Sequence, residues 1–161
     1  MSTKWAGARP ESLAKLYEAG DAWLADCSAR PDLVHQVWYI EGLAPIVTGA
    51  KWLAVEVPFV ATVQAMKRIG TRHLGPILAD PGLDLTWWLI PPDTAEDLAS
   101  VKLAEVQPEG SPLHCPPTGW YQCGRKWLHR PDGSGTLNDP ALLAAALGPG
   151  SGHRLPTEAP G

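Results

Sequence analysis

The chain has 161 residues, of which 45% are hydrophobic, and a formal charge of −4 at neutral pH. These values fit one globular domain with an adequate core, and the acidic balance gives no overall attraction to nucleic acid or to anionic membranes. No apolar run approaches the ~20 residues of a membrane-spanning helix, and residues 1–7 do not resemble a signal peptide. Three cysteines argue against a disulfide framework, so we expect a cytoplasmic protein without a membrane partner.

Three helices are predicted in the first half of the chain. Apolar residues recur at helical spacing over 10–29 and over 31–42, and each segment opens on a proline, which is favoured in the first helical turn. A third helix is expected over 58–70. The side chains that we expect to face the core from the second helix are Leu33, Val34, Val37, Trp38 and Ile40. Those expected along the apolar stripe of the third are Phe59, Val63 and Met66.

Short strands dominate the prediction for the second half. Apolar segments bounded by Pro and Gly turns predict strands at 52–57, 76–80, 85–90, 101–106 and 112–115. Segments 119–121 and 126–128 flank a further predicted hairpin, and Asn138 or Asp139 is expected to cap a closing helix over 141–147.

The predicted fold is a single α+β domain over 10–147. It has a mixed, mostly antiparallel sheet, two N-terminal helices, a middle helix and a C-terminal helix. Residues 1–9 are expected to be flexible, and the Pro- and Gly-rich segment 148–161 to be disordered.

The strand predicted at 52–57 offers little catalytic chemistry. Alternate side chains of a strand face opposite ways, so Trp52, Ala54 and Glu56 share one face. The opposite face carries Leu53, Val55 and Val57. A metal-dependent nucleotidyl transferase needs paired carboxylates to hold two cations, and this face has one. Glu56 is a remnant ligand or general base, or more often in such positions a solvated residue of the outer face.

Aromatic and basic side chains alternate between 120 and 130, with no acidic residue among them. They are Trp120, Tyr121, Arg125, Lys126, Trp127, His129 and Arg130. Such a mixture suits single-stranded nucleic acid, through stacking and phosphate contact. The alternative is a hairpin whose tryptophans pack in the core while its charges face water, which is the commoner fate of large aromatic residues.

A metal or thiol site is not expected. His114, Cys115, Cys123 and His129 lack the close ligand pairs of structural zinc sites, and the adjacent His114 and Cys115 would face opposite sides of a strand. No orienting acid accompanies Cys115, so we interpret the thiols as small core residues and expect no cofactor.

The order of these landmarks resembles small proteins of GC-rich actinobacteria related to the N-terminal domain of bifunctional DNA primase/polymerases, the Prim-Pol or archaeo-eukaryotic primase fold. The resemblance spans about residues 10–147. Its motifs are Gly-Ala-Lys-Trp at 49–52, Gly-Pro-Ile-Leu-Ala-Asp at 75–80, Trp-Trp-Leu-Ile-Pro-Pro at 87–92, Pro-Pro at 116–117, Trp-Leu-x-x-Pro-Asp-Gly at 127–133 and Asp-Pro-x-Leu-Leu at 139–143.

The same resemblance implies a degenerate active site. The paired acidic positions of the family would fall near Ala54 and Glu56, and Trp87 and its neighbour stand on the strand where the family carries a histidine. Asp80 offers a carboxylate near this strand, at a Pro-Gly turn. We therefore regard Glu56, Asp80 and Trp87 as a remnant site without polymerase chemistry.

Two functions follow. The first is a non-catalytic binding or regulatory module that acts on a protein partner or a nucleic acid through its Trp-rich surface, with a homodimer left open. The alternative is a nucleotide-binding or metal-dependent enzyme using Glu56 and Asp80 with His73, and it predicts that these groups converge in one concave pocket.

Overall fold

The computed structural model describes residues 10–148. The helices are α2 (Pro10–Asp26), α3 (Pro31–Tyr39), α4 (Phe59–Ile69) and α5 (Pro140–Leu147). The strands are β1 (Ala44–Val47), β2 (Leu53–Pro58), β3 (Ile77–Asp80), β4 (Leu85–Ile90), β5 (Glu105–Val106), β6 (Pro112–Cys115) and β7 (Lys126–His129). Short 3-10 turns lie at η1 (Thr71–His73), η2 (Pro81–Leu83) and η3 (Ala95–Leu98). The α+β domain is confirmed, whereas the flexible segments predicted at 1–9 and beyond Gly148 lie outside the described residues.

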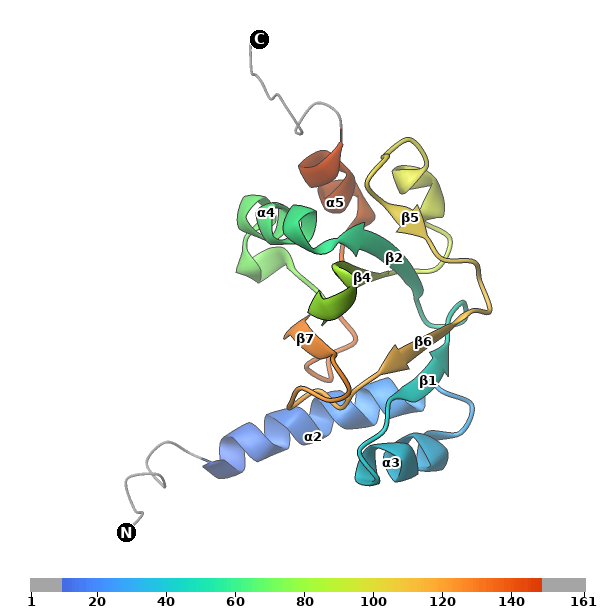
Figure 1. The fold of residues 1–161 in the computed structure, drawn as a ribbon, viewed down its shortest axis with the longest axis vertical. Helices are drawn as coiled ribbons and strands as arrows, with labels where there is room; N and C mark the ends of the chain where they lie inside the picture. Colours follow the sequence, from blue (N-terminus) through green and yellow to red (C-terminus); the bar gives the residue numbers. More distant parts are fainter. Residues whose placement is uncertain (1–9, 149–161) are drawn as a thin grey trace.

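The strands form a five-stranded sheet in the order β5-β2-β4-β3-β7 and a separate pair, β1-β6. Every pairing within residues 10–148 is antiparallel, so the mostly antiparallel sheet that was predicted is confirmed, while the parallel pair that a mixed sheet implies is not found there. Figure 1 shows α4 and α5 at one end of the domain, and α2, α3 and the β1-β6 pair at the other. No helix in this part of the chain has the length and apolar character needed to cross a membrane.

The five-stranded sheet separates two apolar cores. Trp52, Ala54 and Trp87 pack in the core formed with α2, α3 and the β1-β6 pair. Val55 and Trp88 pack in the core formed with α4 and α5. The alternation predicted for the strand at 52–57 is therefore confirmed, and the Trp87-Trp88 dipeptide places one indole in each core.

Two predicted helix faces are wrong in part. Val34 and Trp38 of α3 are buried, but Leu33 is 41% exposed and Ile40, just beyond the helix, is 75% exposed. Positions four apart lie above one another, so the Val34–Trp38 line defines the buried face, and its neighbours in sequence turn outward.

In α4 the buried residues are Thr62 and Ala65, while Val63 of the predicted stripe is exposed. Burial of Thr62 is possible because its hydroxyl is hydrogen-bonded. It lies 2.6 Å from the Thr86 hydroxyl and accepts from Trp88 Nε1 at 2.9 Å. Because its hydroxyl has two hydrogen-bond partners in the core, Thr62 can occupy a buried position that the hydrophobic pattern alone would assign to an apolar residue.

One predicted pairing and the extent of one predicted strand also differ. Segment 126–129 pairs with β3 rather than with 119–121, and the loop between them holds one isolated bridge, Gln122 to Arg125. The strand predicted over 101–106 is reduced to Glu105–Val106. Of the two predicted caps of α5, Asp139 is the one that accepts from the helix, at Ala141 N.

Candidate binding pocket beside β7

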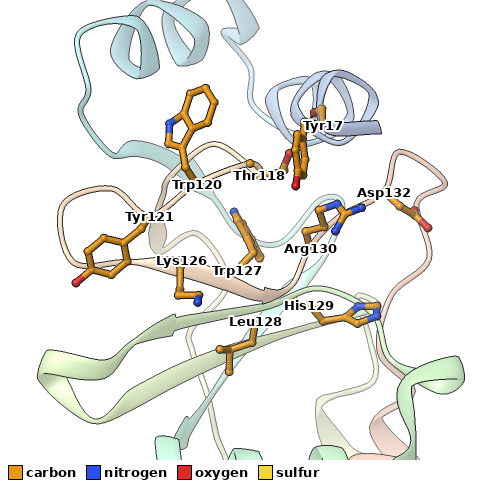
Figure 2. Close-up of a pocket in the computed structure, with 11 residues that line it drawn as sticks. Tyr17, Thr118, Trp120, Tyr121, Lys126, Trp127, Leu128, His129, Arg130 and Asp132 are labelled. Atoms are coloured by element: carbon orange, nitrogen blue, oxygen red, sulfur yellow. The ribbon is translucent and has the colours of Figure 1, made fainter. Parts of the chain in front are cut away.

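A hollow of about 470 Å³ lies beside β7 and is partly enclosed by α2 and the loop at 118–121. Five of the six residues that the sequence marks for partner binding line it, and they are Trp120, Tyr121, Lys126, Trp127 and Arg130. Figure 2 shows Tyr17 and Arg130 at one end of the hollow and Trp120 and Tyr121 towards the other. The structure thus gathers most of the sequence-predicted surface around one concavity.

The loop at 118–121 is fixed against α2. Thr118 N donates to Asp21 Oδ1 at 2.7 Å, and the Thr118 hydroxyl donates to Tyr17 O at 3.1 Å. Gly119 lies against the Tyr17 ring so closely that a Cβ there would come within 3.2 Å of the ring. The missing side chain of Gly119 therefore allows this close approach, with Tyr17 at the wall of the pocket.

The three aromatic residues of the segment have different environments. Trp127 is buried in the core and donates from Nε1 to Pro116 O at 3.1 Å. Trp120 and Tyr121 are 65% and 62% exposed. Trp127 therefore supports the floor of the pocket, while Trp120 and Tyr121 offer apolar surface to a ligand.

Charges of both signs surround the hollow. Lys126 is exposed, and the Arg130 guanidinium lies 5.0 Å from the centre of the Tyr17 ring. Asp132 lies on the same wall, and hydrogen bonds from the Ser134 hydroxyl and amide lower the pKa of its carboxyl group. The pocket is thus ionic but not strongly basic.

Two buried donor or acceptor atoms at this end have no hydrogen-bond partner among the described residues. They are His129 Nδ1 and Arg130 Nε. Buried polar atoms are almost always paired, so these two covered atoms are exceptions at the wall of the hollow.

Arg125, the sixth predicted binding residue, points elsewhere. Its Nε donates to Asp80 Oδ2 at 3.1 Å, and its Nη1 donates to His114 O at 2.8 Å. The guanidinium also lies 4.4 Å from the centre of the Trp87 ring. The side chains of Arg125 and Asp80 are 15% and 13% exposed, so this ion pair belongs to the interior more than to the surface.

The three residues of the predicted remnant site, Glu56, Asp80 and Trp87, are connected to one another by side-chain contacts within the protein. Glu56 Oε1 accepts from Trp87 Nε1 at 3.3 Å, and Arg125 covers Trp87 and binds Asp80. Asp80 also caps η2 by accepting from Leu83 N. Both carboxylates therefore accept hydrogen bonds from neighbouring groups of the protein.

His73, the third group of the enzyme alternative, lies in η1 and lines a different hollow, next to Arg68 and α5. Because α5 packs on the opposite side of the sheet from Trp87, His73 does not share a pocket with Glu56 and Asp80.

The cysteine and histidine residues form no site in the described part of the chain. Within residues 10–148, no three His, Cys, Asp or Glu side chains are placed to hold one metal ion. His114 is exposed and Cys115 is buried, as their adjacent positions on β6 predict. Burial raises the pKa of the Cys115 thiol far above its usual value, which disfavours a nucleophilic thiolate.

Sequence reasoning missed Tyr17, Thr118 and Asp132 as pocket residues. Tyr17 follows the apolar spacing of its helix and is indistinguishable there from a core residue. Its bonded partner, Thr118, is 101 positions away, so no local pattern joins the two.

Comparisons with known proteins add no relative: no protein-family model matches the chain, and no curated protein or solved structure does either.

Proposed function

We propose that this chain is a non-catalytic binding module, regulatory in role, that holds a protein partner in the pocket beside β7. The observation that carries the proposal is the meeting of exposed aromatic side chains, Trp120 and Tyr121, with Lys126 and Arg130 around one hollow. Interfaces are enriched in tryptophan, tyrosine and arginine at their most important contacts, which are the residue types present here.

The apolar surface beside the pocket favours a protein. Gln122 Nε2 donates to Gly42 O at 2.6 Å, and this bond holds the pocket loop against the chain that follows α3. At the end of α3, Tyr39 is 89% exposed and Ile40 is 75% exposed. Large side chains exposed together in this way are typical of interaction surfaces.

The charges are less favourable for nucleic acid. Arg125 is paired with Asp80, which leaves Lys126 and Arg130 to the pocket, and Asp132 lies beside them. Affinity for a nucleic-acid strand depends mainly on how many phosphates the protein neutralises. Two cations next to a carboxylate, in a chain of charge −4, support a protein partner better.

Support for a non-catalytic role comes from the partners of the two candidate carboxylates, because Glu56 accepts from Trp87 and Asp80 is paired with Arg125. These contacts agree with the proposal of a Prim-Pol-like scaffold that lacks the paired acids of the polymerases. The free thiols of all three cysteines fit the cytoplasmic location that we propose.

A displayed library of short random peptides, selected on the immobilised full chain, tests the proposal. We expect peptides to be enriched whose affinity falls by about tenfold or more in Trp120→Ser and in Lys126→Ser, because central aromatic and charged contacts dominate interface energies. Fluorescence anisotropy with the labelled peptide measures the affinity.

Val60→Ser and Lys102→Ser are matched controls, since both side chains are exposed and neither lines the pocket. They should leave peptide affinity unchanged. Labelled oligothymidylate provides the competing arm: tight binding of this probe that weakens steeply with salt, without peptide binding, would show that nucleic acid is the partner.

A further inference from the structure

The pocket lies along the free edge of the sheet. β7 is the last strand in the order β5-β2-β4-β3-β7 and pairs with β3 on one side. Within residues 10–148 no strand pairs with its other side. An unpaired strand edge presents backbone N–H and C=O groups that can pair with another chain.

The lining of the pocket shows that its hollow follows this edge. All residues from 126 to 130 line it. Trp127 packs in the core under α2 and α3, and Leu128 packs against the core under α4 and α5, so their side chains face opposite sides of the sheet. Successive side chains of a strand point to opposite faces of the sheet, and here both kinds line the hollow. The hollow therefore runs beside the strand and does not lie over one face of the sheet.

We infer that the partner contributes an extended, carboxylate-bearing segment that adds to β7 as a sixth strand. This inference rests on the proposed function and specifies its ligand. Strand addition takes affinity from main-chain hydrogen bonds and specificity from pockets for alternate side chains. Lys126 and Arg130 stand at the two ends of the 126–130 stretch that lines the hollow, and they complement one or two acidic side chains of such a segment, fewer charges than a nucleic-acid strand carries.

Unsatisfied atoms support the same occupant. Arg130 Nε is a donor, and His129 Nδ1 is a donor or an acceptor according to its tautomer; both are buried without a partner in the described chain. Both atoms are covered in the unbound chain, so a bound segment, with its carbonyl and carboxylate acceptors and amide donors, pairs with them after the His129 and Arg130 side chains turn towards it. An occupant that pairs these atoms removes the cost of leaving them unsatisfied.

The surroundings favour a single strand over the sheet of a second copy. Tyr17 and Thr118 form the wall opposite β7, and the Thr118–Asp21 hydrogen bond fixes that wall to α2. A helix beside the strand leaves room for an isolated segment but obstructs the broad edge of another sheet with its covering helices.

The test uses the peptide obtained by selection and two N-methylated versions of it. In an added strand, alternate peptide N–H groups point to β7 and the others point away. Methylation of the set that faces β7 should weaken binding by about tenfold or more, since several hydrogen bonds are lost together. Methylation of the other set should have little effect, so the two versions control each other.

Amide hydrogen exchange of the full chain gives a second measure. Backbone amides of β7 that point away from β3 should exchange more slowly when the peptide is bound, because strand addition pairs them. Residues of β5, the opposite edge, should not change and serve as the internal reference.

The outcomes separate the two proposals. If both methylated peptides bind like the parent and β7 amides are not protected, the segment binds through side chains alone; strand addition is then wrong while the protein-binding function stands. If no peptide depends on Trp120 and Lys126, the proposed function itself fails. If light scattering shows a dimer that the peptide dissociates, a second copy occupies the edge and the inference is overturned.

Discussion

Arg125 connects three parts of the molecule through one guanidinium group. It binds Asp80 at the end of β3, donates to the carbonyl of His114 on β6 and covers the ring of Trp87 on β4. Charged hydrogen bonds with little exposure contribute more to stability than those at the surface, because removal of one member leaves the other without a partner.

Arg125→Met is therefore expected to lower the free energy of unfolding by about 2 kcal/mol, because Asp80 and the His114 carbonyl lose their donors. Urea denaturation of the full chain measures the change. The matched control is Arg30→Met, which removes an ion pair with Asp32 whose side chains are 63% and 59% exposed, and it should have no measurable effect. Equal effects of the two substitutions would contradict a structural role for Arg125.

Residue identity alone could not separate these roles. Between 120 and 130 the sequence left two interpretations open, an aromatic and basic binding surface or a hairpin with its tryptophans in the core. The structure contains parts of both: Trp127 and Arg125 are used inside the protein, while Trp120, Tyr121 and Lys126 are exposed. The difference depends on partners elsewhere in the chain, such as Pro116 for the Trp127 indole, which no spacing rule identifies.

At the scale of elements, Asn138 joins the segment before α5 to two neighbouring strands. Its Oδ1 accepts from Gly75 N at 2.7 Å, and its Nδ2 donates to Pro76 O at 2.8 Å and to Leu89 O at 3.1 Å. A Cβ on Gly75 would come within 2.6 Å of Asn138 N, so the two segments touch through their backbones.

Asn138→Ala should destabilise the protein by about 3 kcal/mol, because the buried Gly75 amide loses its acceptor and the Pro76 and Leu89 carbonyls each lose one of two donors, keeping a backbone N–H. Thermal or urea unfolding measures this change. Asp139→Ala, one position along, removes the side-chain cap of α5 and should cost about 1 kcal/mol. A smaller effect at Asn138 than at Asp139 would show that these buried bonds contribute little.

A buried polar chain connects α4 to β4 and β2. Trp88 Nε1 donates to the Thr62 hydroxyl, which lies against the Thr86 hydroxyl, and Thr86 donates to Val57 O at 2.8 Å. Since the Thr86 proton is used in that last bond, Thr62 donates to Thr86 and accepts from Trp88.

Thr62→Val is expected to lower the unfolding free energy by about 2 kcal/mol despite the gain of an apolar methyl group, because the Trp88 N–H then has no acceptor. The reverse exchange at the next residue, Val63→Thr, lies on the exposed side of α4 and should leave stability unchanged. Denaturant titration compares the two variants. A Thr62→Val variant more stable than the parent protein would show that these buried hydrogen bonds do not contribute to stability.

The existence and order of the helices and most strands could be predicted from periodicity and from Pro and Gly boundaries. The buried faces of the helices were harder to predict from the sequence. Thr62, for example, is buried because its hydroxyl has hydrogen-bond partners on another element. The pairing of β7 with β3 does not follow from local signals either, because spacing in the sequence favours the nearest extended segment, 119–121, as the partner of β7. Strand pairing between distant segments depends on the whole packed domain.

For the whole molecule, the two ends of the domain have different roles in our account. α4 and α5 close one core at one end of the domain, and α2 lies at the other end (Figure 1). Residues of α2, of the loop at 118–121 and of β7 line the pocket. The pocket therefore requires the full fold, since the Thr118–Tyr17 bond spans 101 positions. That long separation explains why the sequence could predict the pocket residues between 120 and 130 but neither Tyr17 nor the way these residues come together.

The most direct test of the account is a residue-by-residue NMR titration of the full chain with the selected peptide. We predict that the largest chemical-shift changes fall at 118–121 and 126–130, with small changes around Glu56 on β2, which β4 and β3 separate from β7 in the sheet. Changes centred on Glu56, with little change at 118–121 and 126–130, would contradict the account and move the functional site away from β7.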